Sequence, residues 1–392
     1  MLMPNMVTTN IYNSSTSPIR VTAVSSGRDL REFIALPWKI YADDENWVPP
    51  LKLERRMHFS SFNSYFKNAT WQAWLAYRND KPVGRITAQI DKVHQQHFGK
   101  HSGHFGFMEA ENDPAVFEAL FATGEAWLKQ KGISYVTGPF NFSINQECGV
   151  LVEGFNTPPS ILMPHSRPWY GQCIEDQGYR QAIDLLAYWI DSKDFGENRV
   201  MAKLVKQYTN KIHIRPLNKK SFKSDLEIMR DIFNDAWSNN WGYIPFSKEE
   251  FAELGAALKP FVPDGYIQIT EIDNKPVAFV VILPNLNEVL SELNGKLFPF
   301  GWIKMLRSIR LNKIKTGRIA LMGVRKKYHN SPIGLAMAYM MCAAARVPVV
   351  GSGIEGVEMS WILDNNKGMR SMLKSMSAHI YKRYRIYEKN IL

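Results

Sequence analysis

The sequence predicts an α/β (α+β) fold of two similar domains, each with a mixed central sheet flanked by helices. One observation is a short sequence motif that occurs twice, as Asn-Asp-Lys-Pro-Val at 79–83 and as Asp-Asn-Lys-Pro-Val at 273–277, each between apolar runs of strand length. Asn and Asp tolerate tight-turn backbone angles, so each copy predicts a β-hairpin. A second observation is that one order of strands and helices surrounds both copies, half a chain apart, which indicates a duplicated domain.

The elements of the first half follow from apolar periodicity and from residues that start or stop helices. Residues 1–18 are rich in Asn, Ser and Thr and are expected to be mobile. Pro114 stands where a first helical turn tolerates proline, and Gly132 is a helix stop. The expected elements are a strand at 20–24, a helix at 29–41, the hairpin at 71–91, a histidine-rich turn after it, a strand at 105–108, a helix at 115–131, a strand at 135–138, a helix at 167–177 and a strand at 182–190.

The second half repeats this order after a connector at 191–211. Ser221 is placed to cap the first helix of this half. The expected elements are a strand at 212–215, a helix at 221–239, the hairpin at 266–283 with an insertion to about residue 317, a strand at 318–324, a helix at 333–346, a strand at 356–361, a helix at 366–376 and a strand at 384–388. The domains are therefore expected at 19–190 and 212–392.

Composition favours a folded, cytoplasmic protein. The chain has 392 residues, 45% of them apolar, which suffices for two ordinary cores. Its cysteines, Cys148, Cys173 and Cys342, form no CxxC pair, as is typical of proteins in a reducing compartment. The start shows no charged-then-apolar signal segment, and the longest apolar stretch, 335–350, is too short to span a bilayer.

The net charge of +11 is concentrated in one stretch. Residues 296–327 contain ten Lys and Arg and no Asp or Glu, with Trp302 and several aliphatic residues interleaved. Such a stretch is typical of surfaces that bind anionic lipid, nucleic acid or a phosphate-rich ligand. A solvated helix face with many cations is the alternative. Peripheral contact with an anionic membrane, at the inner membrane face, is expected; nucleic acid is not.

The order of elements is that of GNAT acyltransferases, and the second half carries residues that resemble this superfamily. There the fourth strand leads into an Arg/Gln-x-x-Gly-x-Gly/Ala loop, and the helix start that follows binds the pyrophosphate of coenzyme A through its free amides and positive dipole end. Here residues 329–334 read His-Asn-Ser-Pro-Ile-Gly, so His329 and Pro332 depart from the pattern. The resemblance implies acyl-CoA as co-substrate and no metal, with these binding residues: Gly323, Val324, His329, Asn330, Ser331, Ile333, Gly334 and Asn366.

The resemblance also implies candidate catalytic residues. GNAT members often carry an acid on the fifth strand, and Glu358 matches it as a base that takes a proton from the attacking amine. Among the C-terminal tyrosines, Tyr384 is the candidate general acid. A Glu on an exposed strand face and a packing Tyr are the structural alternatives.

The whole chain resembles more closely a bacterial family of two-domain GNAT-like proteins, mostly identified as uncharacterised N-acetyltransferases. One branch of that family is associated with bacterial ceramide synthesis, in which a fatty acyl group passes from a thioester to a sphingoid amine. The motifs that carry the resemblance are Trp-Val-Pro-Pro-Leu at 47–51, Gly-Arg-Ile at 84–86, His-Phe-Gly-Phe at 104–107, Gly-Pro at 138–139, Asn-Gln-Glu-Cys-Gly at 145–149, Asn-Asp-Ala-Trp at 234–237, Asn-Trp-Gly at 240–242, Pro-Asn-Leu-Asn at 284–287 and Ser-Trp-Ile-Leu-Asp-Asn-Asn at 360–366.

The first half is not expected to bind the donor. Its acidic segment at 109–114 stands in place of the glycine loop and would repel a pyrophosphate. This half is interpreted as a scaffold or as a wall for the acceptor, which would enter between the domains. The candidate acceptor-binding residues are Asn141, Asn145, Asn234, Trp237, Asn240, Trp241 and Asn285.

The sequence thus predicts an N-acyltransferase with two tandem GNAT-like acyl-CoA N-acyltransferase domains. Two alternatives remain: a degenerate, non-catalytic GNAT-like protein that binds anionic membrane or nucleic acid, and a Fem-like aminoacyl transferase. Fem-like transferases usually have a long charged coiled-coil arm, and this sequence shows none, which counts against the second alternative. The closely spaced His94, His97, His101 and His104 have intervals that suit zinc, but no Cys or Asp completes a familiar site, so no metal is expected.

Overall fold

The computed structural model describes residues 17–194 and 199–392, so nearly all of the N-terminal segment expected to be mobile lies outside the described residues. The predicted mixed α/β architecture is confirmed, and both expected hairpins are present. The elements of the first half are β1 (Arg20–Ala23), α1 (Gly27–Ala35), α2 (Pro37–Ile40), α3 (Lys52–His58), β2 (Ala69–Arg78), β3 (Lys81–Asp91), α4 (Lys92–Phe98), β4 (Ser102–Ala110), α5 (Pro114–Gln130), β5 (Tyr135–Gly138), β6 (Phe140–Asn141), β7 (Glu147–Cys148), β8 (Val150–Glu153), α6 (Tyr170–Glu175) and β9 (Arg180–Asp191).

The second half contains the same order with added helices. Its elements are α7 (Arg199–Tyr208), β10 (His213–Pro216), α8 (Phe222–Trp237), α9 (Lys248–Leu258), β11 (Ile267–Ile272), β12 (Lys275–Pro284), α10 (Asn287–Leu293), α11 (Gly301–Arg310), β13 (Thr316–Val324), α12 (Pro332–Gly351), β14 (Gly356–Leu363), α13 (Lys367–Ser375) and β15 (His379–Asn390).

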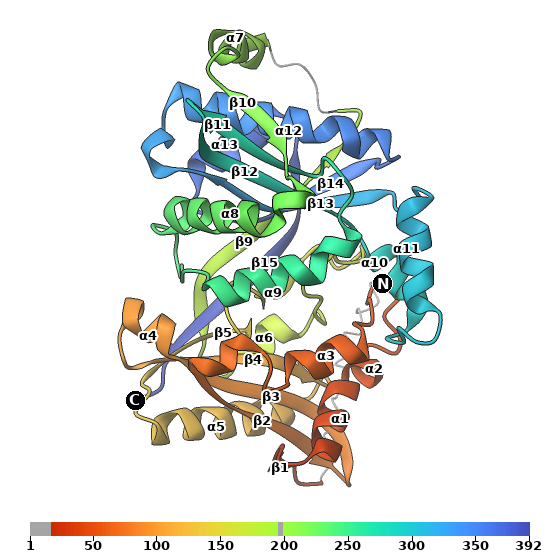
Figure 1. Ribbon diagram of the computed structural model, residues 1–392. Coiled ribbons are helices and arrows are strands. Elements are labelled where there is room, and N and C mark those ends of the chain that lie inside the picture. Colours follow the sequence, from red (N-terminus) through yellow and green to blue (C-terminus); the bar gives the residue numbers. More distant parts are fainter. Residues whose placement is uncertain (1–16, 195–198) are drawn as a thin grey trace, which may run out of the picture.

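One mixed sheet runs through both halves, in the order β1-β2-β3-β4-β5-β15-β9-β14-β13-β12-β11-β10. The last strand of each half lies beside the fifth strand of the other half. β15 pairs with β5, β9 pairs with β14, and β9 and β15 pair with each other at the centre (Figure 1). Each half therefore completes the sheet of its partner half.

Two local predictions were wrong. The helix expected at 29–41 is divided into α1 and α2, because Pro37 lacks the amide that would continue α1 but is well suited to begin a new helix. The histidine-rich connection is not a turn but the helix α4, whose first amides bond to the side chain of Asp91. The connector and the insertion also contain helices, α7 in the former and α10 and α11 in the latter.

The two halves have separate hydrophobic cores on the shared sheet. The core of the second half includes α12, with Ala336, Met337, Met341 and Ala345 buried. Among the described residues α12 is the one helix long and apolar enough to cross a membrane, and half of the tested stretch is buried inside the protein. Its contacts with β11, β12 and β13 identify it as a core helix.

Candidate functional site

A cleft opens in the second half where two parallel strands separate. β13 and β14 pair only from Thr316↔Gly356 to Ile319↔Met359. Beyond that point β13 continues along β12, and β14 continues along β9. The space between the strands has a volume of about 1370 Å³ and is lined by β13, β14, the end of α8, the start of α12, α13 and one side of α7.

The loop before α12 forms one end of this cleft. The Ser331 hydroxyl accepts a hydrogen bond from the Gly334 amide at 3.1 Å and donates to the Tyr328 carbonyl at 2.6 Å. A Cβ at Gly334 would lie only 2.1 Å from that same carbonyl oxygen, so the turn requires glycine there. Since Pro332 has no amide and Ser331 caps Gly334, the first turn offers fewer free donors than a glycine-rich loop does.

The walls of the cleft suit an anion with an apolar tail. None of the described residues that line it is Asp or Glu, whereas Lys203 and His329 do line it. His329 bonds through Nε2 to the Val324 carbonyl oxygen at 2.6 Å. The lining is largely apolar and includes four methionines, Met322, Met359, Met369 and Met372.

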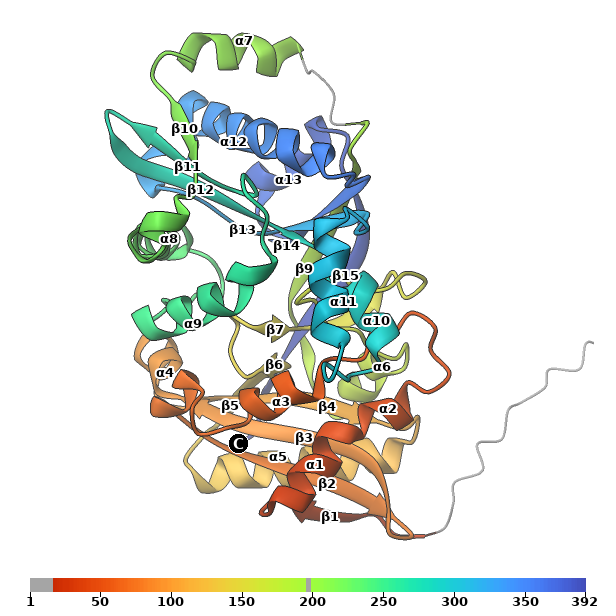
Figure 2. The ribbon, with the colours of Figure 1, turned by 45° about the vertical axis from the view of Figure 1, so that its right-hand side comes forward.

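Most of the predicted donor-binding residues meet at this cleft. Those that line it are Gly323, Val324, His329, Asn330, Ser331, Gly334 and Asn366, while Ile333 does not. Lys203, Leu204 and Gln207 were missed, because they belong to α7, in the segment that was interpreted as a connector. The signal available in the sequence was an amphipathic spacing at 199–208. Figure 2 shows α7 lying above α12, and the two helices are in contact.

Tryptophans form the wall near the boundary between the halves. Trp237, Asn240 and Trp241, three predicted acceptor-binding residues, line the cleft. The Trp237 indole donates to the Met322 carbonyl at 2.9 Å, and its ring meets that of Trp361 nearly at right angles, with centroids 5.3 Å apart. Trp361 was not predicted as a site residue, although it belongs to the motif at 360–366.

The other predicted acceptor-binding residues do not line the cleft. Asn234 bonds to both backbone groups of Phe246, and Asn145 donates to the Ile244 carbonyl at 3.2 Å. Asn141 accepts from the Phe107 amide at 2.7 Å. Asn285 accepts from the Ile161 amide at 2.9 Å. All four bond to the backbone of another segment and so hold parts of the chain in place.

Glu358 lies behind the cleft wall. It is fully buried and accepts hydrogen bonds from the hydroxyls of Ser360 and Tyr381. Arg318, itself buried, lies 3.6 Å from it, measured from Nε to Oε1. Burial and the negative charge of Glu358 raise the pKa of Tyr381, so this tyrosine remains a proton donor. Ser360 is the member of this group that also lines the cleft.

Tyr384, the predicted general acid, is also buried and does not line the cleft. Its hydroxyl has no hydrogen-bond partner among the described residues. Burial, followed by the charge of Glu358, raises its pKa well above the usual range.

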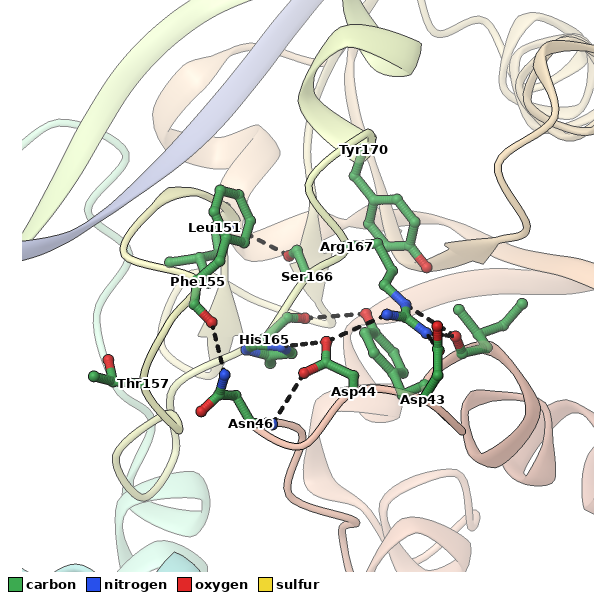
Figure 3. Close-up of polar contacts among 12 residues, drawn as sticks. Asp43, Asp44, Asn46, Leu151, Phe155, Thr157, His165, Ser166, Arg167 and Tyr170 are labelled. Carbon is green, nitrogen blue, oxygen red and sulfur yellow. Dashed lines mark hydrogen bonds and ion pairs between the residues drawn. The ribbon is translucent and has the colours of Figure 1, made fainter. Parts of the chain in front are cut away.

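A loop from the first half holds Arg318 in position. The Ile161 carbonyl accepts from an Arg318 guanidinium nitrogen at 2.8 Å. His165 and Arg167, in the anchored part of this loop, point toward Asp44 and Asp43 (Figure 3). His165 Nε2 lies 2.9 Å from an Asp44 oxygen, and Arg167 Nε donates to the Ile40 carbonyl at 2.9 Å. The first half thus supports the buried charges of the second.

The equivalent opening in the first half is filled by protein. β4 and β5 also pair as parallel strands for three residues and then separate. The segment with β6 and β7 occupies the gap, and Gln89 donates to the Phe140 carbonyl at 2.7 Å. A Cβ at Gly106 would lie 1.9 Å from that carbonyl oxygen. At the helix start beside it, Asp113 caps α5 and forms an ion pair with Arg78.

Two histidines of the cluster pack in the interior. His94 Nδ1 lies 3.1 Å from the Ser102 hydroxyl, and the rings of His94 and His104 meet at right angles with centroids 4.3 Å apart. No group of three or more His, Cys, Asp or Glu suited to a metal occurs in residues 17–194 or 199–392. Burial lowers the pKa of His94 to about 4 and that of His104 well below its ordinary value.

Acidification is therefore expected to destabilise the protein through these histidines. The folded pKa of His94, about 4, lies below its ordinary value of 6.5, so in that window the unfolded chain binds more protons and stability falls as pH falls. The loss from His94 is about 3 kcal/mol on the scale of ~1.4 kcal/mol per pKa unit. Across this pH range the unfolding temperature of His94→Phe should depend less steeply on pH than that of the unmodified protein. His97→Phe, at an exposed position of the same helix, is the control, and an equal slope in both variants would contradict the assignment.

Comparisons with known proteins identify close relatives and the fold. No family model matches the chain. Protein YghO of Escherichia coli (strain K12) is 49% identical over 363 residues, which cover 93% of each chain. The bacterial ceramide synthase of Caulobacter vibrioides (strain NA1000 / CB15N) is 38% identical over 380 residues, covering 96% of this chain and 99% of that one.

Solved structures share the fold at low sequence identity. A tandem GNAT protein from the clavulanic acid biosynthesis pathway superposes with a TM-score of 0.55 at 9% identity, covering 95% of this chain and 99% of that one. A GCN5-related N-acetyltransferase from Sphaerobacter thermophilus gives a TM-score of 0.51 at 12% identity, over 95% and 96% of the two chains. The fold is therefore that of tandem GNAT proteins.

Proposed function

The chain belongs to the bacterial family of tandem GNAT-fold proteins that includes YghO and the bacterial ceramide synthase, and we propose that it is an N-acyltransferase that uses acyl-CoA. The observation that carries the proposal is the cleft between β13 and β14. It combines a helix start, a lysine and a histidine without carboxylates, and a largely apolar lining in one continuous space.

The donor is proposed to lie with its phosphates at the start of α12 and its acyl group between the strands. Lys203 and His329 would face the phosphates, and the Ile333 amide belongs to the same helix start. The cleft volume of about 1370 Å³ exceeds the 300–1,000 Å³ typical of small-molecule sites. Because methionine side chains adapt to irregular apolar shapes, the four methionines support a long acyl chain.

The acceptor is proposed to be a lipid amine of the sphingoid type, which enters along the wall formed by Trp237, Trp241 and Trp361. This wall offers a large apolar surface, and Asn240 beside it can orient a hydroxyl or amine. The name of the Caulobacter relative supports the same class of acceptor. An acyl-CoA donor also supports a cytoplasmic location, in keeping with three cysteines that are free and buried.

In the proposed reaction the amine nitrogen attacks the thioester carbonyl carbon, the carbon–sulfur bond breaks, and the sulfur leaves as the thiol after gaining a proton. Backbone amides of β13 near Gly323 and Val324 would stabilise the charge that develops on the carbonyl oxygen. Because Glu358 has no surface in the cleft, it would take the amine proton through the Ser360 hydroxyl. Proximity of the two substrates is expected to be the largest contribution to the rate.

Reversing the charge of Lys203 is expected to weaken donor binding. Lys203→Glu places a carboxylate against the phosphates and should raise the dissociation constant for acyl-CoA roughly tenfold at low salt, about 1–2 kcal/mol. Lys206→Glu, on the same helix but outside the cleft lining, is the matched control. Isothermal titration at low and high salt would measure the dissociation constant of both variants for acyl-CoA. Salt screens the general charge effect of both substitutions alike, so only a specific contact with the phosphates distinguishes them. Equal losses of affinity in the two variants would contradict the proposed phosphate position.

A further inference from the structure

The turn before α11 and the start of that helix expose large apolar side chains to solvent. Phe298 is 66% exposed and Phe300 72%, and Trp302 and Ile303 follow at 44% and 43%. These four residues lie within six positions of the sequence and are here called the α11 tip. Large apolar side chains are ordinarily scattered singly on a protein surface, and a contiguous group marks a contact surface.

Unpaired cations flank the α11 tip in the sequence. Lys296, Arg307, Arg310 and Lys313 are exposed, and no carboxylate of the described chain forms an ion pair with them. Lys304, also on α11, is paired with Glu292. Residues 296–327 contain no Asp or Glu, so this segment itself contributes only positive charges to the surface.

The helix that carries the α11 tip packs against the rest of the protein. Met305 and Ser308, on the opposite side of α11, are buried, and α10 contacts α11. The segment between these helices is tied to the first half, because the Lys52 amide donates to the Gly295 carbonyl at 3.0 Å and the Trp38 indole donates to Asn294 at 2.7 Å. Figure 2 shows α10 and α11 together at the surface, near α2 and α3.

We propose that the α11 tip docks on an anionic phospholipid bilayer. Aromatic and aliphatic side chains that stand among Lys and Arg match an interface with acyl chains below and negative headgroups around it. Nucleic acid would be recognised by the cations and by stacking, but Ile303 and the adjacent Pro299 would gain nothing from it. This inference does not depend on the proposed acyltransferase activity, although membrane docking would bring the protein to a lipid amine.

Co-sedimentation of the full-length protein with vesicles tests the proposal. The expected result is binding to vesicles of phosphatidylcholine mixed with phosphatidylglycerol, and much weaker binding to phosphatidylcholine alone. The double variant Phe298→Ser/Phe300→Ser should lower the partition coefficient at least tenfold, and Arg307→Gln/Arg310→Gln should lower it for the anionic vesicles and reduce its salt dependence. Phe98→Ser, an exposed phenylalanine on α4, is the matched control and should bind as the unmodified protein does.

Several outcomes would overturn the proposal. They are failure of the unmodified protein to bind either kind of vesicle, equal binding to both, binding unaffected by the tip substitutions, and binding to duplex DNA in place of vesicles. The change in the unfolding temperature of the tip variants when acyl-CoA is added serves as a second measurement. Because the tip lies outside the cleft lining, an unchanged response shows that the variants are folded and separates this proposal from the proposed function.

Discussion

Replacing Glu358 alone by Ala is expected to lower the free energy of unfolding by about 3–5 kcal/mol. The reason is the buried guanidinium of Arg318, whose hydrogen bonds go to the Ser360 hydroxyl and to the Ser360 and Ile161 carbonyls, none of which carries a charge. Without the carboxylate a positive charge remains in the interior with nothing to neutralise it. Urea unfolding followed by circular dichroism would measure the loss.

The double variant Arg318→Met/Glu358→Met is the matched control. When both members of a buried ion pair are replaced by apolar residues of similar volume, stability often changes little. The double variant should therefore be clearly more stable than Glu358→Ala. The single variants Arg318→Met and Glu358→Met complete the comparison. If the double variant lost as much stability as these two single variants together, the charges would not be coupled, and the interpretation of this network would be wrong.

Filling the cleft is expected to abolish the stabilisation that an acyl-CoA gives. A donor at a hundred times its dissociation constant should stabilise the unmodified protein by about 2.7 kcal/mol. Ala338 lines the cleft from α12, so Ala338→Phe puts a ring into the space assigned to the donor. Since the new side chain can extend into this open space, the variant itself should lose no more than about 1–3 kcal/mol.

Ala344→Phe is the corresponding control. It makes the same change on the same helix at a half-buried position that does not line the cleft. Thermal unfolding would be measured with and without palmitoyl-CoA. The ligand should raise the unfolding temperature of Ala344→Phe but not that of Ala338→Phe. Equal responses in both variants would place the donor elsewhere.

The hairpins were predictable because the turn residues themselves determine them. Asn79 and Asp80 have φ of 48° and 59°, and Asp273 and Asn274 have φ of 51° and 59°. These are the backbone angles of a two-residue turn that suits the twist of the flanking strands, and Asn and Asp adopt them more readily than most residues. The repeated order of elements then gave the fold class.

The partners of buried polar groups could not be predicted in the same way. Apolar periodicity shows that β9 and β15 are strands, but it does not show which strands they pair with, so the exchange between halves was not foreseen. Glu358 was expected near the acceptor from resemblance alone. Its burial depends on Arg318 from β13 and on Tyr381 from β15, and both contacts are long-range.

The cleft residues also include some that could be predicted from the sequence and some that could not. Gly334 was predicted from the resemblance to the GNAT loop, and a close backbone approach requires glycine there. The helix α7 was missed because it lies outside the repeated elements. The asparagines expected to contact substrate instead bond to loops, since short polar side chains hold backbone turns as readily as they bind ligands.

A thermal-shift titration with thioesters from acetyl-CoA to palmitoyl-CoA tests the central claim most directly. The account predicts a rise in the unfolding temperature that grows with acyl chain length, because the apolar interior of the cleft would bury the additional methylenes. No rise with any thioester would contradict it. In that case the departures at His329 and Pro332 would mark a cleft that does not bind the donor, and a non-catalytic, membrane-binding role would account better for this chain.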